Sequence, residues 1–284
     1  MKIDFSEITK QLKKFTKQQR KCILDAIEDG IDPTPFADTK FTSDQMDEIR
    51  WGIESKVDIG KYSKAKFDSD TMVTIREALG RGVDVTPYIK GNPDWKNIHM
   101  YALMLENGKD PTPFVKSDFD FTDAVFDECE DAIKEGLDLS PFSLVSELDL
   151  EQFWIAIEGI RLGLDIRPMM NDGFVEWDML EILKGLKDGL DVSVYADPHF
   201  NSDQMEEMRL WLKYGLDLSP HLEKLRRYDD EEFINIDVFG ELKEERLRQM
   251  AEKGIVAVTE EPEEPEPVIP IKVKKSKKKK KKKK

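Results

Sequence analysis

One pattern recurs eight times along the chain and constrains its fold more than any other feature. It is anchored on a helix-ending residue, and successive anchors are 26, 26, 26, 28, 27, 26 and 26 residues apart. The anchors are Gly30, Lys56, Gly82, Gly108, Gly136, Gly163, Gly189 and Gly215. An aspartate stands two positions after every anchor, from Asp32 to Asp217. A register kept over this length indicates tandem copies of one structural unit.

Each copy carries signals for the start of a helix. Fifteen residues before the anchor stands an apolar residue such as Phe41, and the next residue, such as Thr42, is a good N-cap in seven of the eight copies. The pattern therefore also places a helix start at Thr122. Glutamines three positions after the cap predict capping boxes in four copies, at Gln19, Gln45, Gln152 and Gln204.

The rest of the unit predicts a long helix, a turn and a very short helix. Apolar residues ten, seven and three positions before the anchor, such as Met46, Ile49 and Ile53, share one helix face. The anchor glycine ends the helix, because glycine enters the left-handed region without cost. Serine or threonine followed by proline and an aromatic residue, as in Thr86-Pro87, then predicts a short helical turn that places the aromatic ring in the core.

The sequence therefore predicts an all-α fold, an α-solenoid of about eight repeats over residues 15–221. Helical caps are expected at residues 1–14 and 222–258, with helices over 5–14, 229–239 and 241–253. Met250 to Ile255 reads as a degenerate ninth unit. Residues 259–284, an acidic proline-rich linker and a lysine tail, are expected to be disordered.

We find no pattern typical of catalysis, of a metal site or of a cofactor site. The repeated aspartates invite a calcium hypothesis, but each turn supplies one carboxylate, so a role in capping the turn is favoured. His99, His199 and His221 are not paired at metal-ligand spacing. No phosphate-binding glycine loop or nucleophile motif is present. The expectation is a protein that is not an enzyme and has no cofactor.

Two lone cysteines, Cys22 and Cys129, fit a reducing, cytoplasmic compartment better than a disulfide scaffold. Cys129 occupies a core position of its helix, which predicts a buried thiol. No apolar run is long enough to span a membrane, and the first residues have no signal-peptide core, so neither segment is expected.

Large apolar residues in slots that are polar in other repeats are the candidate interface. These residues are Trp51, Trp95, Leu103, Trp154, Trp177 and Leu210. Exposed aromatic side chains are typical anchors of protein interfaces. The alternative is local repacking around the repeats of 28 and 27 residues. Both interpretations stay open for Trp51, and repacking is favoured for Trp154 and Trp177.

The net charge of −15 combines an acidic body with a basic tail. Residues 272–284 hold eleven lysines, and without them 33 basic and 59 acidic residues leave a net charge of −26. The tail lysines expected to contact an anion or nucleic acid are Lys274, Lys275, Lys277, Lys278, Lys279 and Lys280. Pairing of the tail with the acidic body is the competing interpretation.

The segments Phe200–Arg209 and Gly189–Pro198 resemble a repeat found in proteins of gut Firmicutes, their phages and their mobile elements. The resemblance covers about residues 15–221, and the units Pro93–Phe114 and Leu148–Met169 depart from its pattern. It implies an α-solenoid and a mobile-element setting, and no activity.

Three functions compete. The first is a scaffold that binds another protein or peptide. The second is an acidic nucleic-acid mimic that inhibits a DNA-binding defence protein, and the third is an adaptor tethered to nucleic acid by its lysine tail. A continuous acidic stripe would favour mimicry, whereas an aromatic patch around Trp51 would favour protein recognition.

The tether hypothesis makes a direct prediction. Counterion release makes binding by a lysine tract weaken steeply with salt. DNA binding measured by fluorescence anisotropy should therefore depend on salt in the full chain and vanish when residues 272–284 are deleted. Binding that persists after the deletion would exclude the tail as the anchor.

Overall fold

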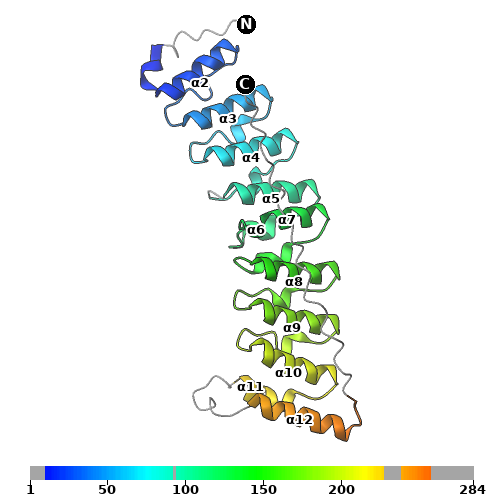
Figure 1. The fold of residues 1–284 in the computed structure, drawn as a ribbon. Helices are drawn as coiled ribbons and strands as arrows, with labels where there is room; N and C mark the ends of the chain where they lie inside the picture. The colour runs from blue at the N-terminus through cyan, green and yellow to red at the C-terminus, as the bar shows by residue number, and fades with distance from the viewer. Residues whose placement is uncertain (1–9, 92–93, 227–237, 257–284) are drawn as a thin grey trace, which may run out of the picture. The chain divides into compact units, whose positions relative to one another are not determined.

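The computed structural model describes residues 10–91, 94–226 and 238–256, and every regular element there is a helix (Figure 1). The all-α prediction is confirmed. The chain divides into two compact units, Met1–Glu147 and Leu148–Lys284. Within each unit, the long helix of one repeat packs on the long helix of the next, which is compatible with a solenoid.

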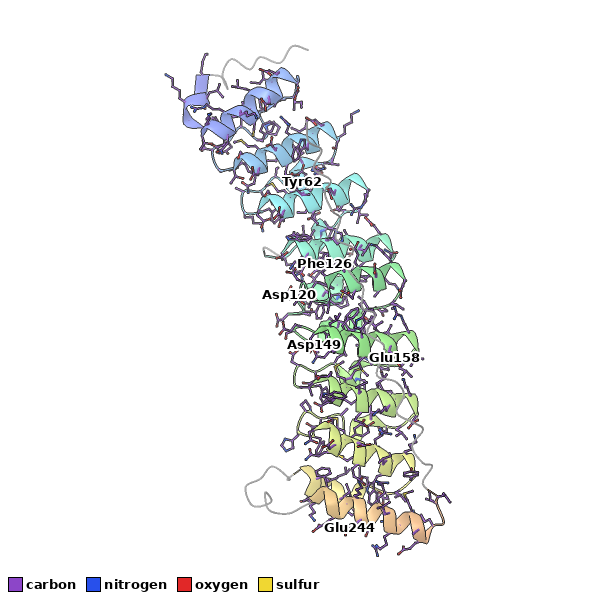
Figure 2. All side chains as sticks on the ribbon, viewed as in Figure 1. Tyr62, Asp120, Phe126, Asp149, Glu158 and Glu244 are labelled. Carbon is purple, nitrogen blue, oxygen red and sulfur yellow. The ribbon has the colours of Figure 1, made fainter. Side chains whose placement is uncertain are left out.

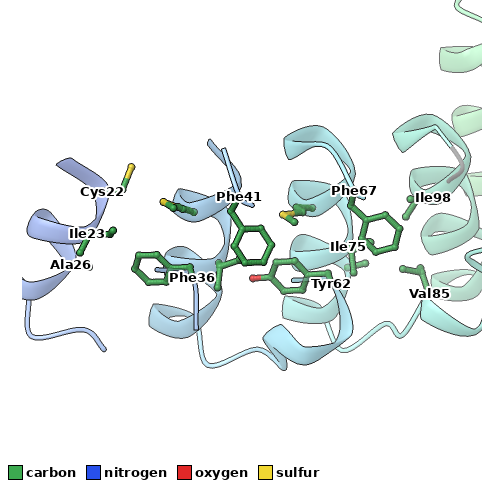
Figure 3. Close-up of a cluster of buried hydrophobic side chains, with 14 of the residues drawn as sticks. Cys22, Ile23, Ala26, Phe36, Phe41, Tyr62, Phe67, Ile75, Val85 and Ile98 are labelled. Carbon is green, nitrogen blue, oxygen red and sulfur yellow. The ribbon is translucent and has the colours of Figure 1, made fainter. Parts of the chain in front are cut away.

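The first unit contains η1 (Leu12–Lys14), α2 (Lys17–Glu28), α3 (Ser43–Glu54), η2 (Ile59–Lys61), α4 (Ser69–Gly80), η3 (Thr86–Tyr88), α5 (Trp95–Glu106), α6 (Thr112–Val115), α7 (Phe126–Lys134) and η4 (Ser140–Leu144). Helix α2 packs on α3, α3 on α4, α4 on α5, and α5 on α7. Figure 3 shows part of the core between them, where buried aromatic rings such as Phe36 and Tyr62 lie between successive helices. Of the expected helix over 5–14, residues 10–14 are helical and the others lie outside the described residues.

The second unit contains α8 (Leu150–Arg161), η5 (Arg167–Met169), α9 (Glu176–Lys187), η6 (Val192–Val194), α10 (Ser202–Lys213), η7 (Ser219–His221), α11 (Leu222–Arg226) and α12 (Val238–Glu252). Helices α8, α9 and α10 pack in sequence, and α12 packs on α10 where another repeat helix would lie. The helix expected over 241–253 thus begins at Val238, and most of the one expected over 229–239 lies outside the described residues.

Helix starts follow the sequence prediction. Thr16, Thr42, Asp149 and Asn201 each form a full capping box with the predicted glutamine. Three of these glutamines have a second role, because their amide nitrogens also donate to a backbone carbonyl of the next repeat. The bonds run from Gln19 to Phe41 at 2.6 Å, from Gln45 to Phe67, and from Gln152 to Phe174 at 2.9 Å. One side chain therefore both caps its own helix and holds the backbone just before the N-cap of the next repeat's helix.

Helix ends also follow the prediction. All seven anchor glycines have φ between +65° and +84°. In every repeat the backbone amide one residue after the anchor donates to the carbonyl four residues before the anchor, as Ile31 does to Ala26. These bonds are 2.8 to 3.1 Å long and form a Schellman motif. Lys56 adopts the same conformation with φ of +59°, at a cost of about 1 kcal/mol for a side chain in this region. Gly254 and the bond from Ile255 to Met250 repeat the motif after α12, as the proposed ninth unit requires.

The repeated aspartates cap the turns. Each accepts a hydrogen bond from the backbone amide two residues later, at 2.9 to 3.2 Å, in all eight repeats. Beside Asp110, the Thr112 hydroxyl and amide donate to the carboxylate and lower its pKa. The structural interpretation of these residues is thus confirmed.

The short helical turns place their aromatic residue against the preceding helix, and the fit depends on the residue four positions before the anchor. Tyr62, which is labelled in Figure 2, is fully buried. It packs over Gly52, and its hydroxyl donates to the Glu48 carbonyl at 3.0 Å. A Cβ at Gly52 would lie 1.8 Å from that hydroxyl. Tyr195 over Gly185 repeats the arrangement, with 1.9 Å for the same contact.

Repeats that carry alanine in the glycine position differ accordingly. Ala26 is matched with Phe36 and Ala132 with Phe142, and both rings are fully buried. Where Ala78 is matched with a tyrosine, Tyr88 is only half-buried. The hydroxyl therefore needs a glycine beneath it to lie fully in the core.

One predicted helix start is wrong. Helix α7 begins at Phe126 rather than after Thr122, and its N-cap, Val125, has no side-chain acceptor. The chain first makes a turn, in which the Val125 amide donates to the Thr122 carbonyl at 3.2 Å. The preceding segment is held by an aromatic cluster, formed by Phe114, Phe119, Phe121 and Phe142 with ring centroids 5.0 to 6.0 Å apart. This is the 28-residue repeat, and its extra residues accommodate that cluster.

We call the hydrogen bond from a capping glutamine to the next repeat the glutamine bridge. It predicts that the same substitution costs more stability at Gln45 than at Gln204. Gln45→Glu keeps an acceptor for the cap but loses the donor to Phe67, so unfolding free energy should fall by about 1–3 kcal/mol in urea denaturation. Gln204→Glu is the control, because among the described residues Gln204 forms only its capping box. It should cost at most about 0.5 kcal/mol. Equal losses would contradict the bridge.

The glycine–tyrosine fit predicts a coupled pair of substitutions. Gly52→Ala should destabilise the protein by about 1–3 kcal/mol through overpacking, and Tyr62→Phe should cost about 1 kcal/mol for its hydrogen bond. The double variant should lose less than the sum of the two single losses, because the hydroxyl at 1.8 Å is gone and only the contacts of the added Cβ at 3.0 Å, with the ring at position 62 and with Ile59, remain. Urea denaturation of the four proteins measures the coupling.

Gly80→Ala is the matched control for this pair. Gly80 is also in a helix, yet the nearest atom to its added Cβ is 4.0 Å away. It should be neutral or stabilising because alanine favours the helix. Additive losses in the double variant would refute the proposed fit.

Candidate interaction surface

The long helices leave one face outside the core. Slots ten, seven and three before the anchor are core positions, whereas slots twelve, nine, five and one lie on the opposite side at helical spacing. In α4 these slots are Asp70, Val73, Glu77 and Arg81, and all four line an open groove. We call the equivalent slots of each repeat the outward face. Trp51, Trp154 and Trp177 occupy outward-face slots five, nine and twelve.

The groove on the outward face of the first unit has a volume of about 410 Å³. One wall is α4, and the other is formed by Trp95 and His99 of α5. Its charges are mainly acidic, because the Arg81 guanidinium is already paired with Glu106 of α5 at 2.6 Å. The groove thus joins an aromatic wall to two carboxylates.

Trp95 and His99 are held in place by the next helix. The ring centroids of Trp95 and Phe126 are 5.6 Å apart, and those of His99 and Phe126 are 5.5 Å apart. The late start of α7 puts Phe126 at its first position, where it supports both rings. The wall is therefore built from packed side chains rather than from a loop.

Trp51 adjoins the groove through Arg76. The Trp51 side chain is 40% exposed, and the Arg76 guanidinium carbon lies 5.8 Å from its ring centroid. The Arg76 Nε donates to the buried Glu48 carboxylate at 2.9 Å, and its Nη2 lies 3.8 Å from Glu77. Burial raises the pKa of Glu48, and the Arg76 contact opposes that rise. The arginine thereby connects the exposed indole to the groove-lining Glu77.

The second unit also exposes a tryptophan on its outward face. Trp177 is 53% exposed, and the neighbouring Val175 is 51% exposed, so local repacking does not explain Trp177. Trp154 is partly buried, with the Arg161 guanidinium carbon 6.0 Å from its ring centroid. Trp154 agrees with the repacking interpretation.

Two other candidates are less accessible than the sequence suggested. Leu103 is only 8% exposed and belongs to the core, which corrects its assignment as an interface residue. Leu210 is half-buried. The tail lysines Lys274 to Lys280 lie outside the described residues.

Sequence reasoning missed Asp70, Val73, Glu77, Arg81 and His99. His99 stands nine residues before its anchor, in the slot that Trp154 occupies, so the slot pattern contained a signal for it. The acidic and apolar groove residues gave none, because single charged or apolar residues on an outward face are common.

Both cysteines are buried. Burial raises the pKa of the Cys22 thiol to about 11 and also raises that of Cys129. Across the described ranges, no group of three or more histidine, cysteine, aspartate or glutamate side chains is arranged to hold a metal ion. No helix in these ranges combines the length and apolar character needed to cross a membrane.

Comparison with known proteins gives no match: no family model, no curated protein and no solved structure matches this chain.

Proposed function

We propose that this protein is a non-catalytic repeat scaffold that binds another protein through the outward face of α3, α4 and α5. The observation that carries the proposal is the surface formed by Trp51, Arg76, the acidic groove and Trp95. Aromatic and arginine side chains are the residues most enriched among energetic hot spots of protein interfaces.

The repeat pattern itself requires neither Trp51 nor Trp95. The exposed Trp51 occupies a slot that holds Asp25 and Glu77 in the flanking repeats, so the helix does not need an aromatic residue there. Trp95 occupies a slot that holds Ser43 and Ser69 in the two preceding repeats. An interface explains large aromatic residues at positions where the fold accepts small or charged ones.

Mimicry of nucleic acid by this surface is less well supported. The outward face of the first unit is not a continuous acidic stripe, because Trp51, Val73, Lys96 and His99 interrupt its carboxylates. A mimic needs regularly spaced negative charge that matches phosphates. Mixed aromatic and charged character favours protein recognition.

The proposal is tested by capture of partners from nuclease-treated extract of the cells that make the protein. Tagged full-length chain should retain a specific set of proteins, and Trp51→Ala/Trp95→Ala should reduce their recovery about tenfold or more in quantitative mass spectrometry. Thr39→Ala, at an exposed loop position away from the outward face, should behave as the original chain.

Circular dichroism melting checks that the variants fold. Trp51→Ala alone provides a second test, because this side chain is exposed and its loss should not unfold the helix. Unchanged capture by both folded variants would refute the proposal.

A further inference from the structure

The groove between α4 and α5 has the chemistry of a pocket for a cationic side chain. Asp70 and Glu77 lie seven residues apart on α4, which places them on the same face about 10 Å apart along the helix axis. Val73 and Thr74 lie between them, and Trp95 faces them from α5. A long side chain with an apolar stem and a positively charged end would match the apolar and acidic parts of this groove.

The carboxylates of the groove are available to such a ligand. Among the described residues, Asp70 has no cationic partner within 4 Å, and the Glu77 carboxylate has only the 3.8 Å contact with Arg76. Arg76 itself donates to Glu48, and Arg81 to Glu106. Both arginines are therefore already paired with other carboxylates, and the groove keeps a negative balance.

The aromatic wall favours a guanidinium over an ammonium group. A planar guanidinium stacks on an indole ring and binds carboxylates through several donors at once, whereas an ammonium is a compact and strongly hydrated charge. In the described residues, arginines lie over indole rings, Arg76 over Trp51 and Arg161 over Trp154. Lysines lie over phenylalanine rings instead.

We propose that the groove lined by Asp70, Val73, Glu77 and Trp95 binds an arginine side chain of the partner protein. The proposal rests on the proposed function, because it names the partner chemistry recognised by that surface. The arginine stem lies over Val73 and Trp95, and its guanidinium reaches one of the two carboxylates, which lie on either side of Val73 along α4. A partner segment with an exposed arginine in an extended or helical peptide fits these requirements.

The test uses the full-length chain and two blocked peptides, acetyl-Gly-Ser-Arg-Ser-Gly-amide and the same peptide with citrulline in place of arginine. Citrulline keeps the shape of arginine and removes its charge. Titration followed by NMR should shift the Trp95 indole N–H signal with the arginine peptide, and the citrulline peptide should bind about tenfold more weakly or worse.

Asp70→Asn/Glu77→Gln should weaken the arginine peptide about tenfold. Glu28→Gln/Asp29→Asn is the matched control, because it removes the same two charges from exposed positions of α2 and its C-cap and should leave binding unchanged. Circular dichroism confirms that both variants are folded. Equal binding of the two peptides, equal effects of the two double variants, or an unshifted Trp95 signal would each overturn the proposal.

These outcomes are separable from the test of the scaffold function. If Trp51→Ala/Trp95→Ala loses the captured proteins while Asp70→Asn/Glu77→Gln retains them, the surface binds a partner through other chemistry. The arginine assignment then fails and the scaffold function stands.

Discussion

The contact between one repeat and the next is the interaction on which this fold depends. A single helix of twelve residues with one apolar face is marginal in water and cannot bury that face alone. The capping glutamine supplies part of the link, because Gln19, Gln45 and Gln152 each satisfy their own helix start and a buried carbonyl of the following repeat. Local helix formation and the stacking of neighbours are thereby joined in one side chain.

Buried and partly buried ion pairs provide a second link between neighbouring helices. Glu48 pairs with Arg76, and Glu181 pairs with Arg209 at 2.8 Å, both across a separation of 28 residues. At the end of the second unit Glu207 has no ninth full repeat to meet, and Arg246 of α12 forms a two-bond pair with it at 2.6 and 2.9 Å. Removing one partner of such a pair would leave a buried charge, so these pairs favour one stacking register over slipped alternatives.

Local features were predictable from the sequence, and features that need two repeats were not. The caps at Thr42 and Asn201, the glycine helix ends and the aspartate turns depend on bonds within a few residues, so residue type and spacing suffice. The late start of α7 depends on Phe119 and Phe121 packing with rings of other segments. The Arg76 contacts depend on how α3 and α4 face each other.

The same division agrees with the proposed recognition through the outward face. Core slots are restricted by packing, as the Gly52–Tyr62 fit illustrates, and the slots of Glu48 and Arg76 are restricted by their ion pair. Apart from the buried Leu103, residues in slots twelve, nine, five and one make few such contacts, so they can change at little cost in stability. A repeat that specifies its own stacking leaves this face free to vary between copies. The proposed binding function would therefore account for differences such as tryptophan in one copy and glutamate in the next.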